Sequence, residues 1–166
     1  MNSLLYKKHS FRNNSGSGVE KPSEFTPTPF HLFIKGETKN LKSALVRLSF
    51  WLMTFGKAKL YYISSPSGKI MHTSYVLPKC LKFSFFNKGD YCIGPCVTYP
   101  EFRGRGIYPT VLNLICQSDN YPDDTVFYII VSDTNTPSVR GIEKAGFELC
   151  GKVRKTRFLK RYFMER

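Results

Sequence analysis

The chain has 166 residues, a length that fits one domain with one sizeable hydrophobic core. Hydrophobic residues make up 42% of it, which excludes an intrinsically disordered chain. The formal net charge of +13 favours an anionic partner, such as CoA, another phosphorylated ligand, nucleic acid or an anionic membrane, and charge does not choose among them.

Residues 1–29 are predicted to form a polar N-terminal lead-in or tail, and residues 30–166 a single domain. The tail contains a linker-like Ser-Gly run and is tied down only if Leu4, Leu5 and Tyr6 dock. No signal peptide is apparent, and the longest apolar patch, residues 44–55, is too short to span a bilayer. The five cysteines lack zinc spacing and fit small core residues. A cytoplasmic protein without a bound metal is therefore expected.

The first regular elements are a short strand at residues 30–34 and a helix from Leu41 to about Phe55. Asn40 is the expected N-cap of this helix, and Gly56 its stop. Phe50 and Met53 either add core contacts or face a substrate or partner. The residues predicted to face the core follow helical spacing: Leu41, Ala44, Leu45, Leu48, Trp51, Leu52 and Phe55.

Strands dominate the middle and the end of the chain. A hairpin is predicted from strands at residues 59–63 and 69–76, and His72 lies on the apolar face of the second strand. In the next strand, residues 91–98, Gly94 and Pro95 predict a bulge or a break in pairing. The later predicted elements are a buried strand at 126–131, a helix at 137–145, and strands at 147–151 and 156–163.

A glycine-rich turn separates the strand at 91–98 from a predicted helix at 107–116. Such a turn directs backbone N–H groups outward at a helix N-terminus, where they bind anions. Gly104 and Gly106 leave room for a ligand, and Arg103 and Arg105 add positive charge. The turn lacks the Gly-Lys-Ser/Thr of a P-loop and the third glycine of a dinucleotide site. The glycines alone leave two interpretations open, a pyrophosphate cradle or an ordinary turn with solvated arginines.

Two segments in order along the chain resemble the GNAT family of N-acyltransferases. Arg103-Gly104-Arg105-Gly106-Ile107, preceded by Tyr99-Pro100-Glu101-Phe102, is similar to the acyl-CoA-binding motif of that family, Arg/Gln-x-x-Gly-x-Gly/Ala. Asn135-Thr136-Pro137-Ser138-Val139-Arg140-Gly141-Ile142-Glu143-Lys144-Ala145-Gly146-Phe147 is similar to its downstream segment. The resemblance covers roughly residues 30–152 and departs from the motif at Tyr108, which replaces the last glycine.

The resemblance implies an α/β (α+β) fold, with a mixed, largely antiparallel sheet, helices on both faces, and strands that splay at the CoA site. It implies acetyl-CoA, or another acyl-CoA, as co-substrate. Backbone groups of Cys96 and Thr98 would bind the pantetheine arm, and Asn135 would bind it or position the thioester. Asn135 and Ser138 fit a helix cap equally well. The implied cofactor-binding residues are Cys96, Thr98, Arg103, Gly104, Arg105, Gly106, Ile107, Asn135 and Ser138.

Catalytic residues are less defined. Many GNAT enzymes use a tyrosine to protonate the departing thiolate, and the matching residue here, Ile142, has no proton to donate. Tyr99 is the candidate acid, and His72 or Asp133 the candidate base. The alternatives are a packed tyrosine, a core histidine and a turn aspartate. Proximity and polarisation of the carbonyl group could also supply most of the catalysis.

The predicted reaction is transfer of an acetyl group from CoA to a primary amine. Residues 93–96 and 106–109 resemble acyltransferases of bacterial surface-polysaccharide pathways, which suggests an amino-sugar acceptor. An amine on a protein or RNA, or a non-catalytic basic binding module with this fold, are the alternatives. The basic run at 152–161 fits a solvated edge strand or a surface for an anionic acceptor. The sequence leaves the oligomeric state open, with a dimer among the options.

Overall fold

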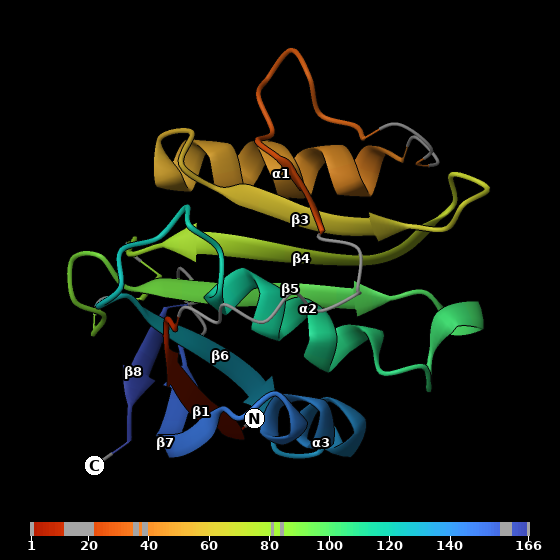
Figure 1. Ribbon diagram of the computed structural model, residues 1–166. Coiled ribbons are helices and arrows are strands. Elements are labelled where there is room, and N and C mark those ends of the chain that lie inside the picture. Colours follow the sequence, from red (N-terminus) through yellow and green to blue (C-terminus); the bar gives the residue numbers. More distant parts are fainter. Residues whose placement is uncertain are drawn as a thin grey trace.

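The computed structural model describes residues 2–11, 22–34, 37, 40–80, 82–83, 85–156 and 161–165. Within them one eight-stranded sheet forms, in the order β2-β3-β4-β5-β6-β1-β7-β8 (Figure 1). Neighbouring strands are antiparallel, except that β5 runs parallel to β6. The strands are β1 (Asn2–His9), β2 (Ser23–Phe25), β3 (Lys59–Ser64), β4 (Ile70–Pro78), β5 (Tyr91–Thr98), β6 (Val126–Ser132), β7 (Glu148–Lys155) and β8 (Tyr162–Met164).

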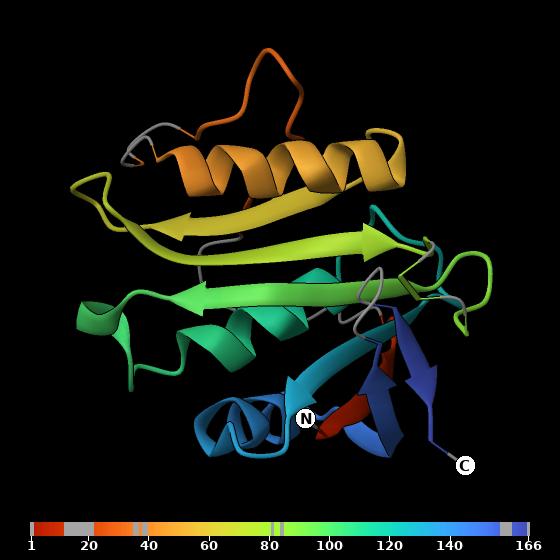
Figure 2. The same cartoon turned by 180° about the vertical axis from the view of Figure 1, so that it is seen from behind.

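Helices cover both faces of the sheet, as predicted. Helices α2 (Ile107–Cys116) and α3 (Thr136–Lys144) lie on one face, and α1 (Leu41–Thr54) lies on the other (Figures 1 and 2). Each face has its own core. Val111, Leu112 and Ile142 are buried against one face, and Phe50 is buried against the other, where its ring meets the ring of Tyr75 edge to face. No helix in the described part of the chain is long and apolar enough to cross a bilayer.

The N-terminal segment differs from the predicted tail. Residues Asn2–His9 form β1, which lies inside the sheet and pairs with β6 on one side and β7 on the other. The condition for docking is met, because Leu5 and Tyr6 are buried. Lys8 adds a polar anchor, since its Nζ donates to the Asn113 side chain at 2.8 Å and to the carbonyl oxygen of Ala145. The linker-like residues 15–18 lie outside the described residues.

Of two other strand predictions, one fails and one is confirmed in part. The segment predicted as a strand at residues 30–34 contains only an isolated bridge between Thr28 and His31. At the C-terminus β8 covers Tyr162–Met164 alone, and residues 157–160 of the predicted strand lie outside the described residues. The described sheet ends at β2 on this side, so residues 30–34 add no strand to it.

Helix α1 begins and ends near its predicted bounds, but it buries a different face. Asn40 caps it by accepting a hydrogen bond from the backbone N–H of Lys42 at 2.7 Å. The buried residues are Arg47, Phe50 and Thr54, not the predicted leucine stripe. Arg47 is held there because its guanidinium pairs with Glu37 at 2.6 Å and its Nε donates to the Tyr75 hydroxyl at 3.1 Å. The predicted stripe is therefore exposed at four positions and half-buried at the other three. The exposed residues are Leu41, Leu45, Leu52 and Phe55, and the half-buried ones are Ala44, Leu48 and Trp51.

Strand β5 creates the gap that becomes the site. Val76 of β4 pairs with Ile93, and Ser74 pairs with Cys96, so β5 has one extra residue at Gly94-Pro95. The predicted bulge is therefore present. Pairing of β5 with β6 is limited to Tyr91 and Cys92. Beyond Cys92 the two parallel strands separate, which leaves the β6-facing edge of β5 without a strand partner.

Candidate functional site

A cleft of about 660 Å³ lies where β5 ends and where α2 and α3 begin. Nine of the residues predicted as site residues contribute to its lining, and three do not. The cleft brings together residues from β4, β5, α2, α3 and the turns before the two helices: His72, Cys96, Thr98, Arg103, Gly104, Gly106, Ile107, Asn135 and Ser138. Tyr99, Arg105 and Asp133 are outside the lining.

The glycine turn forms one rim of this cleft. Gly104 and Gly106 have φ angles of +75° and +73°, in the left-handed region that favours glycine. A Cβ atom built on either glycine would meet no other atom within 4 Å, so open space lies in front of both. No side chain caps α2, and its first backbone bond is donated by Thr110 to the Gly106 carbonyl at 3.2 Å. The preceding N–H groups of Ile107 and Tyr108 are thus free of intrahelical partners.

Three cations stand around the same opening. Arg103, Arg140 and Lys144 line the cleft and are exposed to solvent, and no described lining residue is acidic. Arg140 and Lys144 are four residues apart on α3, so both side chains lie on one face of the helix. Arg103 is oriented by its Nε, which donates to the backbone carbonyl of Thr98 at 3.1 Å. The rim therefore combines positive charge with the N-terminus of α2, a combination that favours an anion.

The inner wall of the cleft is a hydrogen-bonded chain of side chains. The Nδ1 atom of His72 bonds the Thr98 hydroxyl at 2.7 Å, and its Nε2 atom bonds the Ser74 hydroxyl at 2.7 Å. Cys96 and Tyr108 line the cleft next to this chain. One ring nitrogen of a neutral imidazole donates and the other accepts, and the two hydroxyls can satisfy either arrangement.

Burial sets the protonation states of this wall. His72 is fully buried, and desolvation lowers its pKa to about 4, so the ring is neutral at pH 7. Desolvation raises the pKa of Cys96 to about 11 and raises the pKa of Tyr108 well above its usual value. The thiol and the phenol are therefore both protonated at neutral pH. With both ring nitrogens bonded, His72 has no free lone pair for an incoming amine.

Tyr108, together with the rim cations Arg140 and Lys144, lines the cleft but was not among the predicted site residues. The ring of Tyr108 lies 5.7 Å from the ring of His72, and it passes so close to α3 that a Cβ on Gly141 would lie 2.6 Å from it. The two positions are thus matched, because a tyrosine at 108 requires a glycine at 141. The available signal was a pair of departures from expectation, a bulky residue at a motif glycine position and a glycine within a helix.

The three predicted residues outside the cleft have other surroundings. Tyr99 packs against the core cluster on the α1 face and donates its backbone N–H to the Met71 carbonyl at 3.0 Å. Asp133 is exposed in the turn after β6. The Arg105 guanidinium lies over the ring of Phe102 and donates to the Glu101 carbonyl at 3.2 Å. Ile142, at the family's tyrosine position, is fully buried.

Asn135 has the capping role that the sequence allowed. Its side-chain oxygen accepts a hydrogen bond from the backbone N–H of Ser138 at 3.4 Å, at the first turn of α3. Both residues also line the cleft. The cap places the N-terminus of α3 beside the N-terminus of α2, so two helix ends of positive potential border one opening.

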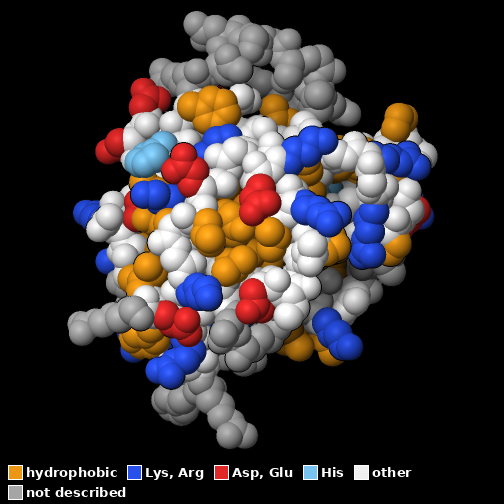
Figure 3. All heavy atoms as spheres, turned by 90° about the horizontal axis from the view of Figure 1, so that it is seen from below, with side chains coloured by type: hydrophobic (Ala, Val, Ile, Leu, Met, Phe, Trp, Pro, Cys, Tyr) orange, Lys and Arg blue, Asp and Glu red, His pale blue; other side chains and the backbone are white. Residues whose placement is uncertain are grey.

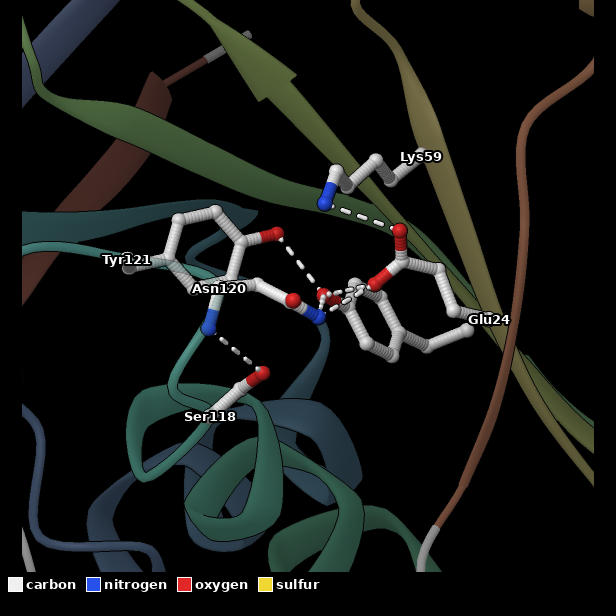
Figure 4. Close-up of polar contacts among 6 residues, drawn as sticks. Glu24, Lys59, Ser118, Asn120 and Tyr121 are labelled. Carbon is white, nitrogen blue, oxygen red and sulfur yellow. Dashed lines mark hydrogen bonds and ion pairs between the residues drawn. The ribbon is translucent and has the colours of Figure 1, made fainter.

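A second polar cluster outside the cleft is structural (Figure 4). Glu24 bonds the Tyr61 hydroxyl at 2.8 Å, the Asn120 amide at 2.6 Å and the Lys59 ammonium at 2.8 Å. The Tyr61 and Tyr121 hydroxyls are 3.0 Å apart, and burial raises the pKa of Tyr61 to about 12. Because these groups satisfy one another, the cluster ties β2 and β3 to the loop before β6.

Comparison with known proteins supports the fold assignment. No protein-family model matches this sequence, and no curated protein matches it. Among solved structures, an acetyltransferase from the GNAT family from Colwellia psychrerythraea superposes with a TM-score of 0.56 at 17% identity, covering 90% of this chain and 53% of that one. A putative GNAT acetyltransferase from Novosphingobium aromaticivorans gives 0.53 at 11% identity, with 92% and 62% covered.

A tandem GNAT protein from the clavulanic acid biosynthesis pathway gives a TM-score of 0.54 at 16% identity, covering 89% of this chain and 50% of that one. The chain thus spans about half to three-fifths of the length of these structures. At such low identity the likeness establishes the fold, which is the GNAT fold that the two sequence motifs predicted.

Proposed function

We propose that this chain is an acyl-CoA-dependent N-acyltransferase that moves an acetyl group from acetyl-CoA to a primary amine. The observation that carries the proposal is the cleft itself. It joins an uncapped helix N-terminus, two open glycines and three cations to the unpaired edge of a strand. That combination fits a long ligand with a polyanionic head and an amide-containing arm.

The residues present fit CoA group by group. The pyrophosphate would lie against the turn at Gly104 and Gly106, where backbone N–H groups and open space coincide. Arg140 and Lys144 are available to the remaining phosphate, and no acidic lining residue opposes it. The edge of β5 at Cys96 and Thr98 would accept the amides of the pantetheine arm, because β6 has left that edge free. Arg103 already occupies one group of that edge, the Thr98 carbonyl.

The cleft does not suit a nucleic acid as well as it suits CoA. A single hollow with three cations offers few phosphate contacts compared with the long basic surface that nucleic acid requires. On the lower face of the molecule, Lys and Arg are scattered among acidic and apolar side chains (Figure 3). An amino sugar is our proposed acceptor, on the strength of the sequence resemblance at residues 93–96 and 106–109.

The chemistry requires few protein groups. A neutral amine nitrogen forms a bond to the thioester carbon, the C–S bond breaks, the amine loses a proton, and the sulfur gains one. His72 is unsuited to take the amine proton directly, since it is buried and bonded at both nitrogens. Asp133 lies outside the cleft lining, so water at the cleft mouth is the proposed route for that proton. Tyr108, whose hydroxyl neighbours the Cys96 thiol, is the proposed donor of a proton to the departing CoA thiolate.

Acetyl-CoA binding tests the proposal. Binding to the native state alone raises stability by about 2.7 kcal/mol at a hundredfold excess over Kd, so the melting temperature should rise clearly in millimolar acetyl-CoA. Inorganic pyrophosphate at equal concentration controls for general stabilisation of a cationic protein by anions. Thiol release in the presence of a panel of amines, amino sugars included, then reports turnover. No shift beyond the pyrophosphate control would contradict the proposal, and binding without turnover would favour a non-catalytic module.

A further inference from the structure

Helix α1 presents an apolar seam to solvent on the side opposite its own core. The seam consists of Leu41, Leu45, Leu48, Leu52 and Phe55, with Phe55 at the C-cap. Successive seam residues are separated by four, three, four and three positions, the heptad spacing at which one helix packs along another. The residues buried in the domain, Arg47, Phe50 and Thr54, occupy the other face, so the helix has two distinct surfaces.

The seam is exposed to a degree that is unusual for a row of large apolar side chains. Leu41 is 74% exposed, Leu45 56%, Leu52 59% and Phe55 90%. Leu48, at the centre of the seam, is half-buried. The seam is one continuous row of largely exposed apolar side chains, the kind of surface that marks an interaction site on a protein.

The charges around the seam select the kind of partner. Apart from Lys42, the side chains of α1 on the seam side carry no charge, and Arg47 is buried against the domain. A helix that lies in a membrane surface normally has a row of Lys and Arg beside its apolar face, which α1 lacks. A second apolar helix needs no such row. The identical seam of another copy of this chain is a surface of that kind.

An antiparallel pairing of two copies satisfies the electrostatics of both helices. Opposite ends of the two helix dipoles then lie side by side. Lys42, in the first turn, would approach the C-terminal end of the partner helix, whose own last turn has no basic residue. The midpoint of the seam is Leu48, so a two-fold axis would pass close to that residue in each copy.

We propose that two copies of this chain form a dimer through the α1 seam, packed antiparallel about a two-fold axis at Leu48. The seam lies on the face of the sheet opposite α2 and α3, so the dimer leaves the cleft open on both copies. The inference is therefore independent of the proposed enzymatic function.

Light scattering during gel filtration, over a wide range of concentration, tests the proposal on the full chain. The wild type should be a dimer that dissociates on dilution. The Leu45→Glu variant places a carboxylate from each copy in the seam and should raise the dimer Kd by at least ~100-fold. Leu149→Glu is a matched control, because Leu149 is 57% exposed but lies on β7, at the other end of the sheet (Figure 1). It should remain a dimer.

Cysteine cross-linking tests the antiparallel arrangement. Leu48→Cys should form a disulfide-linked dimer above the wild-type background, whereas Leu41→Cys should not, because residue 41 meets the partner's far end. Cross-linking at both positions would indicate a parallel pair and overturn the two-fold axis at Leu48. A wild type that stays monomeric, or a Leu45→Glu variant that stays dimeric, overturns the seam interface. A monomer that floats with anionic vesicles, with flotation lost in Leu45→Glu, would assign the seam to a membrane instead.

Discussion

The rim and the inner wall of the cleft differ in solvent exposure and in charge. The rim is exposed and cationic, with open space at Gly104 and Gly106 and with backbone donors at Ile107 and Tyr108 that have no intrahelical partner. The wall is neutral, and its buried His72 bonds the hydroxyls of Ser74 and Thr98 while its ring lies beside that of Tyr108. The rim is thus suited to hold a ligand by charge, whereas the wall is suited to give the ligand a fixed surface.

Because of this difference, mutations at the rim and mutations in the wall should have different effects on the protein. A change at the rim should alter ligand affinity and leave the protein folded, because few native contacts are lost. A change in the wall should alter stability, its pH dependence or turnover, because each group there holds another in place. The following measurements test this separation, from the largest expected effect to the smallest.

The largest effect is expected at His72 as a function of pH. Burial lowers its pKa from 6.5 to about 4, so between these values the unfolded chain binds a proton that the folded chain does not. The stability that the neutral imidazole of His72 contributes is present above pH 6.5 and is lost as the pH falls to 4. The free energy of unfolding should fall by about 3 kcal/mol over this range, at 1.36 kcal/mol per pKa unit. Urea unfolding at several pH values should show that loss in the wild type and not in His72→Gln.

The exposed His9 of β1 provides the control for this experiment. His9→Gln removes an imidazole from the surface and should keep the wild-type dependence on pH. Equal slopes for wild type and His72→Gln between pH 6.5 and 4 would show that the buried imidazole is protonated without penalty, and the wall would then not be the neutral layer described above.

At the rim, the Gly106→Val variant should weaken acetyl-CoA binding by at least a hundredfold, or about 2.7 kcal/mol. The new side chain enters the open space in front of the turn. It also strains the backbone, since φ is +73°, at a cost of about 1–2 kcal/mol. Gly68→Val separates the two effects, because Gly68 has a φ of +79° and equally open surroundings in the β3–β4 hairpin. Titration calorimetry should show normal affinity in that control. Equal affinity in both variants would make the turn purely structural.

Part of the rim could be predicted from the sequence because its features are local. A glycine turn and an asparagine cap act within three or four residues, so the open turn at Gly106 and the capping role of Asn135 could be anticipated. The bulge at Gly94-Pro95 was predictable for the same reason. The positive φ of Gly106 and the rim cations Arg140 and Lys144 were not predicted. His72 and Cys96 were named as separate site residues, but their grouping with Tyr108 in one wall could not be predicted. The three residues come from β4, β5 and α2, which only the tertiary fold brings together.

Tertiary context also explains the failures away from the cleft. Periodicity in α1 identified a leucine stripe correctly but could not say whether that stripe meets its own core, and the Arg47–Glu37 ion pair turned the opposite face inward. Strand β1 was missed because a polar segment of alternating pattern is indistinguishable from a tail until two strands flank it. Both errors concern which surfaces meet, a question that local propensity does not answer.

The smallest effect, and the one that decides the chemistry, is expected from a pair of tyrosines. Tyr108 and Tyr99 lie on opposite faces of the sheet, one in the cleft and one in the α1-side core. A general acid typically accelerates the chemical step by about 10²–10⁴-fold. Because water can partly replace the lost hydroxyl, Tyr108→Phe should lower kcat by at least ~10-fold. The KM for acetyl-CoA should change little, because the ring that faces His72 remains. Tyr99→Phe should retain wild-type turnover. Steady-state kinetics with an amine found by screening separates the two residues. A loss of kcat confined to Tyr99→Phe would identify Tyr99, not Tyr108, as the proton donor.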